Sequence, residues 1–254
     1  KIFTTLVCGL MTTTLFSQWS PTSMQGQKLR PETQVKNYYT LDLNLLQTQL
    51  RGAVEAGKGN KPVIINLPTL EGKIEKFAVY SAPVVVKSLA DKYQLGSYAG
   101  VSVDDNRKSV RFSLSPNDFQ SMIFSNGNYE FIEPQNADKT VYGVFPKSNK
   151  TGNAFECSTK ENLLSKAEID RLRQDTGGAT QSNSYNKNND QKFRTYRLAI
   201  SVTGEYTTFF GGVPQAVAGI NATMTRVNGV FEKDFAIRMI LQDFPQLIYT
   251  DATT

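Results

Sequence analysis

The stretch that decides the fold of the C-terminal part of the chain is FRTYRLAISVTGEYTTFFGGVPQAVAGINATMTRVNGVFEKDFAIRMILQD, residues 193–243. Its first segment alternates apolar with smaller or charged side chains, and this period of two predicts a strand with one better-buried face. The apolar positions are Tyr196, Leu198, Ile200 and Val202. A short apolar run at the end of the stretch predicts a second strand, one face of which carries Phe235, Ile237, Met239 and Leu241.

A long helix is predicted between the two strands. Apolar residues recur there at steps of three and four and line one side of a helix, at Val217, Ile220, Met224, Val227 and Phe231. Gly211, Gly212 and Pro214 mark its beginning, because proline is tolerated only in the first turn. Two strands joined by such a helix lie parallel, with a right-handed crossover. The stretch therefore predicts one βαβ unit, whose sheet we expect to be truncated at Thr254.

The charge pattern indicates a solvated surface. The formal net charge of the 254 residues is +5, and basic residues are scattered among acidic ones. A nucleic-acid footprint would need a basic patch or stripe. We therefore expect no nucleic-acid partner.

The N-terminus has the pattern of a secretory signal peptide over residues 1–17. Lys1 is followed by the apolar run IFTTLVCGLMTTTLF and then by the small residue Ser17. The run is too short and too rich in threonine for a membrane span, which needs about 20 apolar residues. Lipidation at Cys8 is not favoured, because Val7 before it is not small. We expect a secreted, extracellular protein, and the missing initiator methionine suggests a fragment.

The next part of the chain predicts a β-rich module. Residues 18–37 are polar and broken by Pro21 and Pro31, which predicts a flexible lead-in. Residues 38–146 begin with a short helix that Asp42 caps and that ends near Gly52. Short strands follow at regular spacing, together with a helix within 83–93 and an Asn126-Gly127 hairpin turn. The module is therefore predicted to be mainly antiparallel, in an α+β fold.

Residues 147–192 predict a linker. They contain few apolar side chains and end in a tract of Asn, Ser and Gln. Such a segment buries too little surface to offset its ordering entropy, apart from one short amphipathic helix with Leu163, Leu164, Ile169 and Leu172. We expect residues 175–192 to be accessible to proteases.

Two independent resemblances to one family appear at this point. The segments LAISVTGEYTTFFGG, INATMTRVNGVFEKDFAIRMIL and IYTDA resemble the opening of the catalytic domain of secreted bacterial, reprolysin-like metzincin zinc metallopeptidases. The segments LDLNLL, INLPTLEGKIEKFAVYSAPVV, SYAGVSVDD and RFSLSPNDFQSMIFSNG resemble the propeptide of the same enzymes. The resemblance implies a propeptide at 38–146 and the start of an α/β catalytic domain at 193–254.

The resemblance also implies a Zn²⁺ cofactor whose ligands lie elsewhere. The family holds its zinc on a later helix with the motif H-E-x-x-H-x-x-G-x-x-H, whereas this sequence contains no histidine. We therefore expect the chain to be inactive by itself and to lack catalytic residues. Without histidine, a Ser-His or Cys-His nucleophile is excluded as well.

Cys157 is the candidate metal-binding residue. Family propeptides place a cysteine thiolate on the zinc in the position that the catalytic water needs. Cys157 lies between the propeptide module and the catalytic start, although Ser158 and Thr159 follow it where many such cysteines precede glycine. The alternatives are an unpaired linker thiol and a disulfide to a cysteine outside this sequence.

Other motifs have simpler explanations. Glu205 follows the first strand and has either a cation-binding role or a surface or capping role. Asp104, Asp105 and Asn106 predict a turn, because they lack the spacing of a calcium loop. Glycosylation triplets begin at Asn149 and at Asn221, and we discount both. Gly211-Gly212 lacks the lysine and the spacing of a phosphate loop.

The sequence thus favours the N-terminal portion of a secreted zinc metalloendopeptidase precursor. The whole enzyme would act on protein or peptide substrates, and its own catalytic domain would be the partner of the propeptide. The alternative is a secreted, non-enzymatic β-rich binding or inhibitory module.

Overall fold

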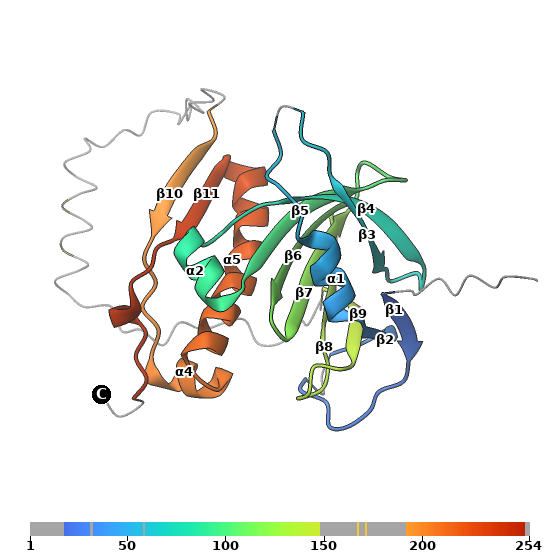
Figure 1. The fold of residues 1–254 in the computed structure, drawn as a ribbon, viewed down its shortest axis with the longest axis horizontal. Helices are drawn as coiled ribbons and strands as arrows, with labels where there is room; N and C mark the ends of the chain where they lie inside the picture. The colour runs from blue at the N-terminus through green and yellow to red at the C-terminus, as the bar shows by residue number, and fades with distance from the viewer. Residues whose placement is uncertain are drawn as a thin grey trace, which may run out of the picture. The chain divides into compact units, whose positions relative to one another are not determined.

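The computed structural model describes residues 18–30, 33–57, 59–147, 167, 171 and 192–251. The described residues up to Lys147 and those from Phe193 onward pack into one compact unit. Residues 149–192 form a separate unit, of which Ala167, Arg171 and Lys192 are described. The fold is α+β, as expected (Figure 1).

The larger part of the compact unit is a nine-stranded antiparallel sheet. Its strands occur in the spatial order β1-β2-β9-β8-β7-β6-β5-β4-β3. Their bounds are β1 Trp19–Thr22, β2 Asn37–Leu41, β3 Val63–Pro68, β4 Ile74–Ser81, β5 Gly96–Ser102, β6 Ser109–Ser115, β7 Asp118–Ser125, β8 Asn128–Pro134 and β9 Tyr142–Pro146. From β3 to β9 each strand pairs with the next along the chain, which is the meander that regular strand spacing predicts.

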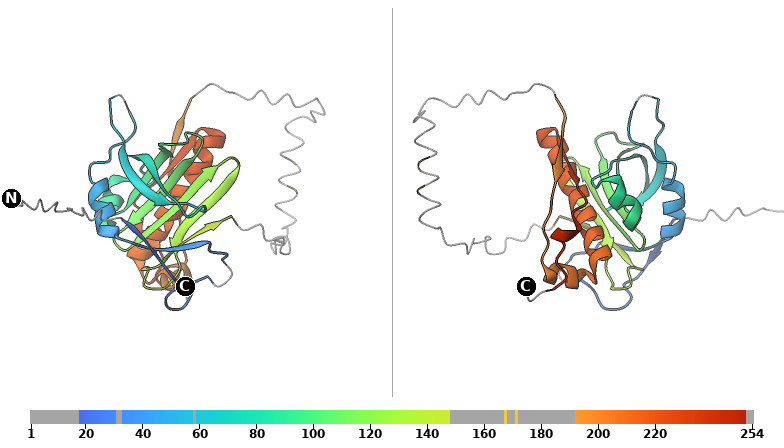
Figure 2. Two further views of the ribbon diagram at one scale, coloured as in Figure 1. Left: turned by 90° about the vertical axis from the view of Figure 1, so that its right-hand side faces the viewer. Right: turned by 60° about the vertical axis from the view of Figure 1, so that its left-hand side comes forward.

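The sheet curls so that its two end strands approach each other (Figure 2). The Trp19 indole N–H of β1 donates to the Asn66 carbonyl oxygen of β3 at 2.9 Å. Helix α1 (Leu43–Leu50) packs beside β3, and its Leu46 and Leu50 point into the core. The concave side therefore holds an aromatic and aliphatic core that includes Phe77, Phe112, Phe119, Ile123, Ile132 and Tyr142.

Two predicted local features of the module are confirmed. Asp42 caps α1, because its carboxylate accepts a hydrogen bond from the Leu45 N–H at 2.9 Å. Asn126 and Gly127 have φ values of 50° and 82°, and they join β7 to β8. These positive φ values are those that an Asn-Gly hairpin turn requires.

The C-terminal part contains the predicted βαβ unit. Strand β10 (Arg194–Leu198) pairs in parallel with β11 (Ile237–Leu241), and the long helix α5 (Val213–Phe235) connects them with Pro214 in its first turn. A short 3-10 helix, η1 (Pro245–Leu247), follows β11. The two-stranded parallel pair confirms the expected topology.

The boundaries predicted in this unit need three corrections. The first strand ends at Leu198, so Ile200 and Val202 lie beyond it, and Val202 makes only an isolated bridge with Ile248. A separate helix, α4 (Gly204–Phe210), precedes α5, because Thr203 caps it and Gly211 ends it with φ of 89°. Phe235 belongs to α5 and is exposed, since the chain leaves the helix at Ala236.

The predicted better-buried face is confirmed from Leu198 onward, because Leu198, Ile200 and Val202 are more buried than the intervening Arg197, Ala199 and Ser201. Tyr196, which was predicted on the same face, is half exposed. In the described residues β10 pairs with β11 alone.

The prediction of a flexible lead-in over residues 18–37 is contradicted at Trp19–Thr22. Residues 19–22 form β1, and the Trp19 side chain is 2% exposed in contact with Tyr39, Phe119 and Tyr142. Pro21 is compatible with this arrangement because β1 is an edge strand, where proline is tolerated.

The helix predicted within 83–93 is shorter than expected. Helix α2 spans Lys87–Tyr93; before it, Val85 forms an isolated parallel bridge with Leu241 and Val86 is extended. The Val86 N–H donates to the Leu241 carbonyl oxygen, and the Leu241 N–H donates to the Val84 carbonyl oxygen, both at 2.9 Å. The module thus adds a short parallel bridge to β11, and this pairing keeps Val84–Val86 out of the helix.

Candidate functional site

The feature that joins the module to the C-terminal unit is a helix-docking face on the outside of the curled sheet. We define this face by Ser97, Arg111, Met122, Phe124 and Glu133, which lie on β5, β6, β7 and β8 and contact α5. Helix α5 lies along it in each view of the ribbon (Figures 1 and 2). Close approach is possible because Gly229 of α5 has no side chain; a Cβ there would stand 2.9 Å from Cγ of Arg111.

A buried polar network forms the first contact. The Ser97 hydroxyl donates to Oδ1 of Asn221 at 2.9 Å, and Nδ2 of Asn221 donates to the Gly96 carbonyl oxygen at 3.0 Å. The Thr225 hydroxyl lies 2.9 Å from Oγ of Ser97 and 2.7 Å from the Asn221 carbonyl oxygen. Asn221 and Thr225 are each 1% exposed, so their polar atoms need these partners.

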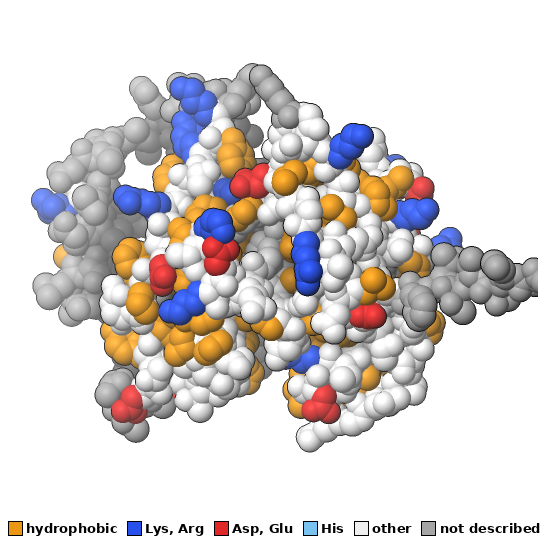
Figure 3. All heavy atoms as spheres, viewed as in Figure 1, with side chains coloured by type: hydrophobic (Ala, Val, Ile, Leu, Met, Phe, Trp, Pro, Cys, Tyr) orange, Lys and Arg blue, Asp and Glu red, His pale blue; other side chains and the backbone are white. Residues whose placement is uncertain are grey.

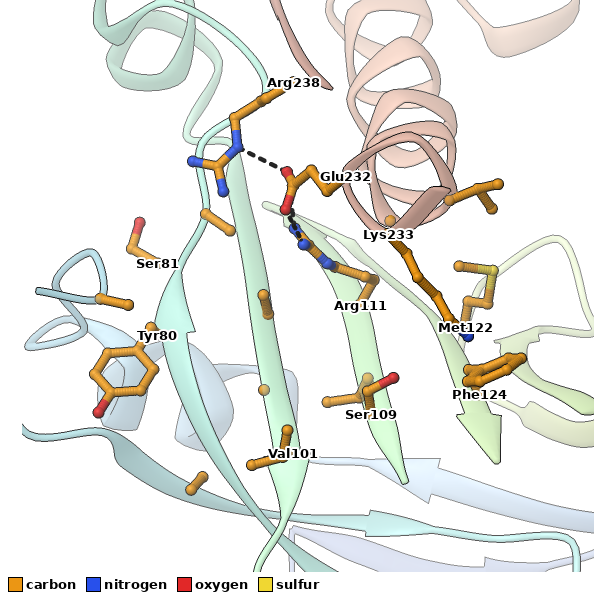
Figure 4. A pocket seen from close by; sticks show the side chains of 18 of the residues that line it. Tyr80, Ser81, Val101, Ser109, Arg111, Met122, Phe124, Glu232, Lys233 and Arg238 are labelled. Carbon is orange, nitrogen blue, oxygen red and sulfur yellow. Dashed lines mark hydrogen bonds and ion pairs between the residues drawn. The ribbon is translucent and has the colours of Figure 1, made fainter. Parts of the chain in front are cut away.

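A buried carboxylate between two arginines forms the second contact (Figure 4). Glu232 of α5 accepts hydrogen bonds from Arg111 of β6 and, at 2.7 Å, from Nε of Arg238 of β11. Burial alone would raise the pKa of Glu232, but the hydrogen bonds and charges of Arg238 and Arg111 outweigh it and lower this pKa below 4.5. The carboxylate therefore stays charged and links three elements.

Glu133 of β8 makes the third contact. Its carboxylate is almost fully buried, and it pairs with Arg226 of α5 at 2.7 Å and with Arg30 of the N-terminal segment. The Arg226 guanidinium also lies over the Phe131 ring, 5.4 Å from its centroid. Planar guanidinium groups suit such combined pairing and stacking.

An apolar cluster forms the fourth contact, at the other side of α5. Val84, Val85 and Leu89 of the module are buried against Ile220, Met224 and Leu241 of the C-terminal unit. The helix therefore presents an apolar stripe to α2 and β11 and a polar stripe to the sheet.

A cavity of about 560 Å³ lies beside the end of α5 (Figure 4). Its walls come from both parts of the compact unit and include Tyr80, Val101, Met122, Phe193, Glu232 and Arg238. Lys233 borders it with its ammonium 3.2 Å from the centroid of the Phe124 ring. Both arginines near the cavity already pair with Glu232, so the walls offer mainly apolar surface.

Charges of both signs are interspersed on the face of the molecule shown in Figure 3. Lys87 and Asp91 of α2 are one such pair, 2.6 Å apart and largely exposed. None of the described helices is long and apolar enough to cross a bilayer.

Comparison with known families identifies the C-terminal unit. Residues 192–254 match the family described as Metallo-peptidase family M12B, reprolysin-like. This C-terminal segment belongs to the reprolysin-like M12B metallopeptidases. No curated protein and no solved structure matches the chain. The family thus covers α4, α5 and the two parallel strands, whereas the nine-stranded module lies outside the matched residues.

The residues of the reprolysin-like segment do not fit a catalytic zinc site. Active M12B members imply zinc, yet the whole sequence contains no histidine. The described residues contain no group of three His, Cys, Asp or Glu side chains placed to hold a metal. No catalytic step is therefore assigned to this chain. Cys157, the predicted inhibitory ligand, lies outside the described residues.

Several minor candidates have structural roles. Glu205 is exposed in the first turn of α4, where backbone and Thr203 hydrogen bonds lower its pKa. Asp105 accepts hydrogen bonds from the Arg107 backbone and side chain, so the predicted turn is confirmed. Gly212 precedes α5 with φ of 120°. Asn221 is buried in α5 and binds Ser97, which explains its glycosylation-like triplet without a glycan.

The docking contacts were not predicted from the sequence. A signal was nevertheless present, because Asn221, Thr225, Asn228 and Glu232 follow one another at steps of three and four. They form a polar stripe beside the apolar stripe of α5. Asn228 differs in its partner, since it binds the Met239 backbone of β11 and not the module.

Proposed function

We propose that the chain is the N-terminal part of a secreted zinc-dependent metalloendopeptidase precursor, in which the nine-stranded module is the propeptide. The observation that carries this proposal is the packing of the module on α5, the central helix of the family-matched segment. A propeptide must hold the catalytic domain of its own chain, and this module holds the beginning of one.

The chemistry of the contact supports a folding role for the propeptide. Asn221 and Arg226 of α5 find partners on the module, at Ser97, Gly96 and Glu133. Each such hydrogen bond contributes about 0.5–1.5 kcal/mol relative to water, so α5 is less stable without the module. The propeptide would therefore assist folding and keep the enzyme latent until the linker is cut.

The surface of the reprolysin-like segment supports a larger catalytic domain. Every exposed aromatic side chain of the described residues belongs to this segment, namely Phe193, Tyr196, Phe209, Phe235, Phe244 and Tyr249. The concentration of exposed aromatic side chains in one segment supports a further contact surface there. We propose that further catalytic-domain residues, including the zinc-binding His/Glu helix, cover part of it. The substrates would be proteins or peptides, and no nucleic-acid partner is proposed.

The first test is the reading frame beyond Thr254. A helix with the H-E-x-x-H motif within roughly the next hundred residues, the usual span of a domain, supports the peptidase. The exported precursor should then cleave a protein substrate after maturation and lose this activity to a zinc chelator. A frame that stops at Thr254 would instead favour the secreted, non-enzymatic binding module.

Cys157 is tested in the same complete precursor. If its thiolate occupies the zinc, Cys157→Ala gives peptidase activity before the linker is cut. Unchanged latency of this variant would assign Cys157 to the linker or to a disulfide, and would leave latency to the docked module.

A further inference from the structure

The docking contacts lie on both sides of the predicted maturation linker, and none of those described uses the linker itself. On one side are Ser97, Arg111 and Glu133 of the module, and on the other are Asn221, Arg226 and Glu232 of α5. The linker at 147–192 separates the two groups in the sequence. Cutting it removes no hydrogen bond or ion pair among these six side chains.

The contacts are of a kind that holds two separate chains together. Thr225 and Asn221 bury a closed hydrogen-bond network with Ser97, and Glu232 and Glu133 are buried carboxylates with cationic partners from the other piece. The Val84–Val86 bridge to Leu241 adds two backbone hydrogen bonds. Strand addition and desolvated charge pairs are both used in stable protein–protein interfaces.

We infer that cleavage of the linker does not release the module, which remains bound to the reprolysin-like segment as a separate chain through the helix-docking face. The inference rests on the proposed function in one respect, namely that the linker is cut during maturation of the precursor. Activation then takes two events: the linker is cut, and the bound module is afterwards displaced or degraded. The polar stripe of α5 is compatible with later release, because Asn221, Thr225, Arg226 and Glu232 can each be solvated.

The experiment cuts the folded chain at a chosen place. A recognition sequence for a site-specific protease replaces residues 179–185, ATQSNSY, in the chain from Gln18 to Thr254. The protein is folded intact, cut, and analysed by size-exclusion chromatography with mass detection. We expect the two pieces to elute together at the mass of the uncut chain and to separate only in denaturant. Separation in native buffer at micromolar concentration overturns the inference.

Variants then test which residues hold the two cut pieces together. Asn221→Ala combined with Glu232→Ala is expected to raise the dissociation constant of the cut pieces at least about tenfold, which corresponds to about 1.4 kcal/mol. Thr225→Val is a milder variant that keeps the side-chain volume if the double variant does not fold before cutting. Arg107→Ala is the matched control, because its ion pair with Asp105 is exposed and does not touch α5. Pieces that stay together equally well in all variants would contradict the assigned face.

Cys157→Ala separates this inference from thiol-based latency. The cut pieces of this variant should remain bound, since the docking contacts do not include Cys157; their dissociation would overturn the inference. The readout is the mass of the complex and not peptidase activity. If the zinc peptidase proposal fails, the measured binding of the cut pieces still stands. If the cut pieces separate, the zinc peptidase proposal is not affected.

Discussion

Glu232 is the residue at which the module, α5 and β11 meet. Its carboxylate binds Arg111 of the module and Arg238 of β11, and its side chain is 10% exposed. Charges that are so far removed from water depend on each other, because each one would be costly alone. The neighbouring Gly229 lets Arg111 approach the helix closely enough to pair.

Glu232→Gln is expected to destabilise the chain by about 3 kcal/mol, because it leaves Arg111 without its charged partner and Arg238 with only the exposed Glu55 carboxylate, 4.0 Å away. Urea unfolding followed by circular dichroism measures this change. Asp91→Asn is the control, since its pair with Lys87 is largely exposed and should contribute less than about 0.5 kcal/mol. Equal effects of the two substitutions would show that the buried pair has no special role.

The same residue predicts a pH dependence. The folded pKa of Glu232 lies below its ordinary value of 4.5, so its stabilising contribution is complete above that value. The contribution is lost as the pH falls through the lowered folded pKa. Glu130 contributes to the pH dependence in the opposite direction. Burial raises the pKa of Glu130, so its protonation at low pH removes the cost of a buried charge. We expect the stability difference between the wild type and Glu232→Gln to shrink from about pH 5 to about pH 3. A difference independent of pH would contradict the lowered pKa.

At the scale of elements, the close pairing of β4 with β5 depends on Gly100. A Cβ at this position would stand 2.5 Å from the Ala78 carbonyl oxygen and 3.0 Å from Cα of Val79, and both are backbone atoms that cannot turn aside. The pair matters for the site, because β5 also carries Ser97 to the helix-docking face.

Gly100→Ala should therefore destabilise the chain by about 2 kcal/mol through overpacking. Thermal or urea unfolding measures the loss. Gly52→Ala is the matched substitution, since nothing lies within 4 Å of its added Cβ, and it should change stability by less than about 1 kcal/mol. If Gly100→Ala is as mild as Gly52→Ala, the strands can separate locally without cost.

At the scale of the whole molecule, the module and the reprolysin-like segment should unfold together. Both belong to one compact unit, joined by the buried network at Asn221 and the ion pairs at Glu133 and Glu232. The single tryptophan, Trp19, reports on the module core through its fluorescence. The 23-residue α5 is the longest described helix and contributes strongly to the far-ultraviolet circular dichroism.

We expect the two signals to give the same urea midpoint, as a two-state transition requires. Glu232→Gln should move both midpoints, because it weakens the contact between the two parts. Two separated transitions in the wild type would instead show that the module and the segment fold independently.

Local chemistry was readable from the sequence where neighbouring residues supply it. The Asp42 cap, the Asn126-Gly127 turn and the apolar stripe of α5 depend on contacts within a few residues, and all three are confirmed. Trp19 and Val84–Val86 were misread because their partners are distant: Tyr142 for the former and Leu241 for the latter.

The sequence by itself therefore determined the α+β class, the antiparallel module, the parallel βαβ unit and the reprolysin-like family of residues 192–254. Only the tertiary structure decided that the module binds α5 through Ser97, Arg111 and Glu133. Hydrophobic periodicity predicts which side chains are buried, because burial follows the repeat of a helix or strand. Periodicity does not predict which surface covers these side chains, because the contacting residues are more than a hundred positions apart in the sequence, such as Ser97 and Asn221.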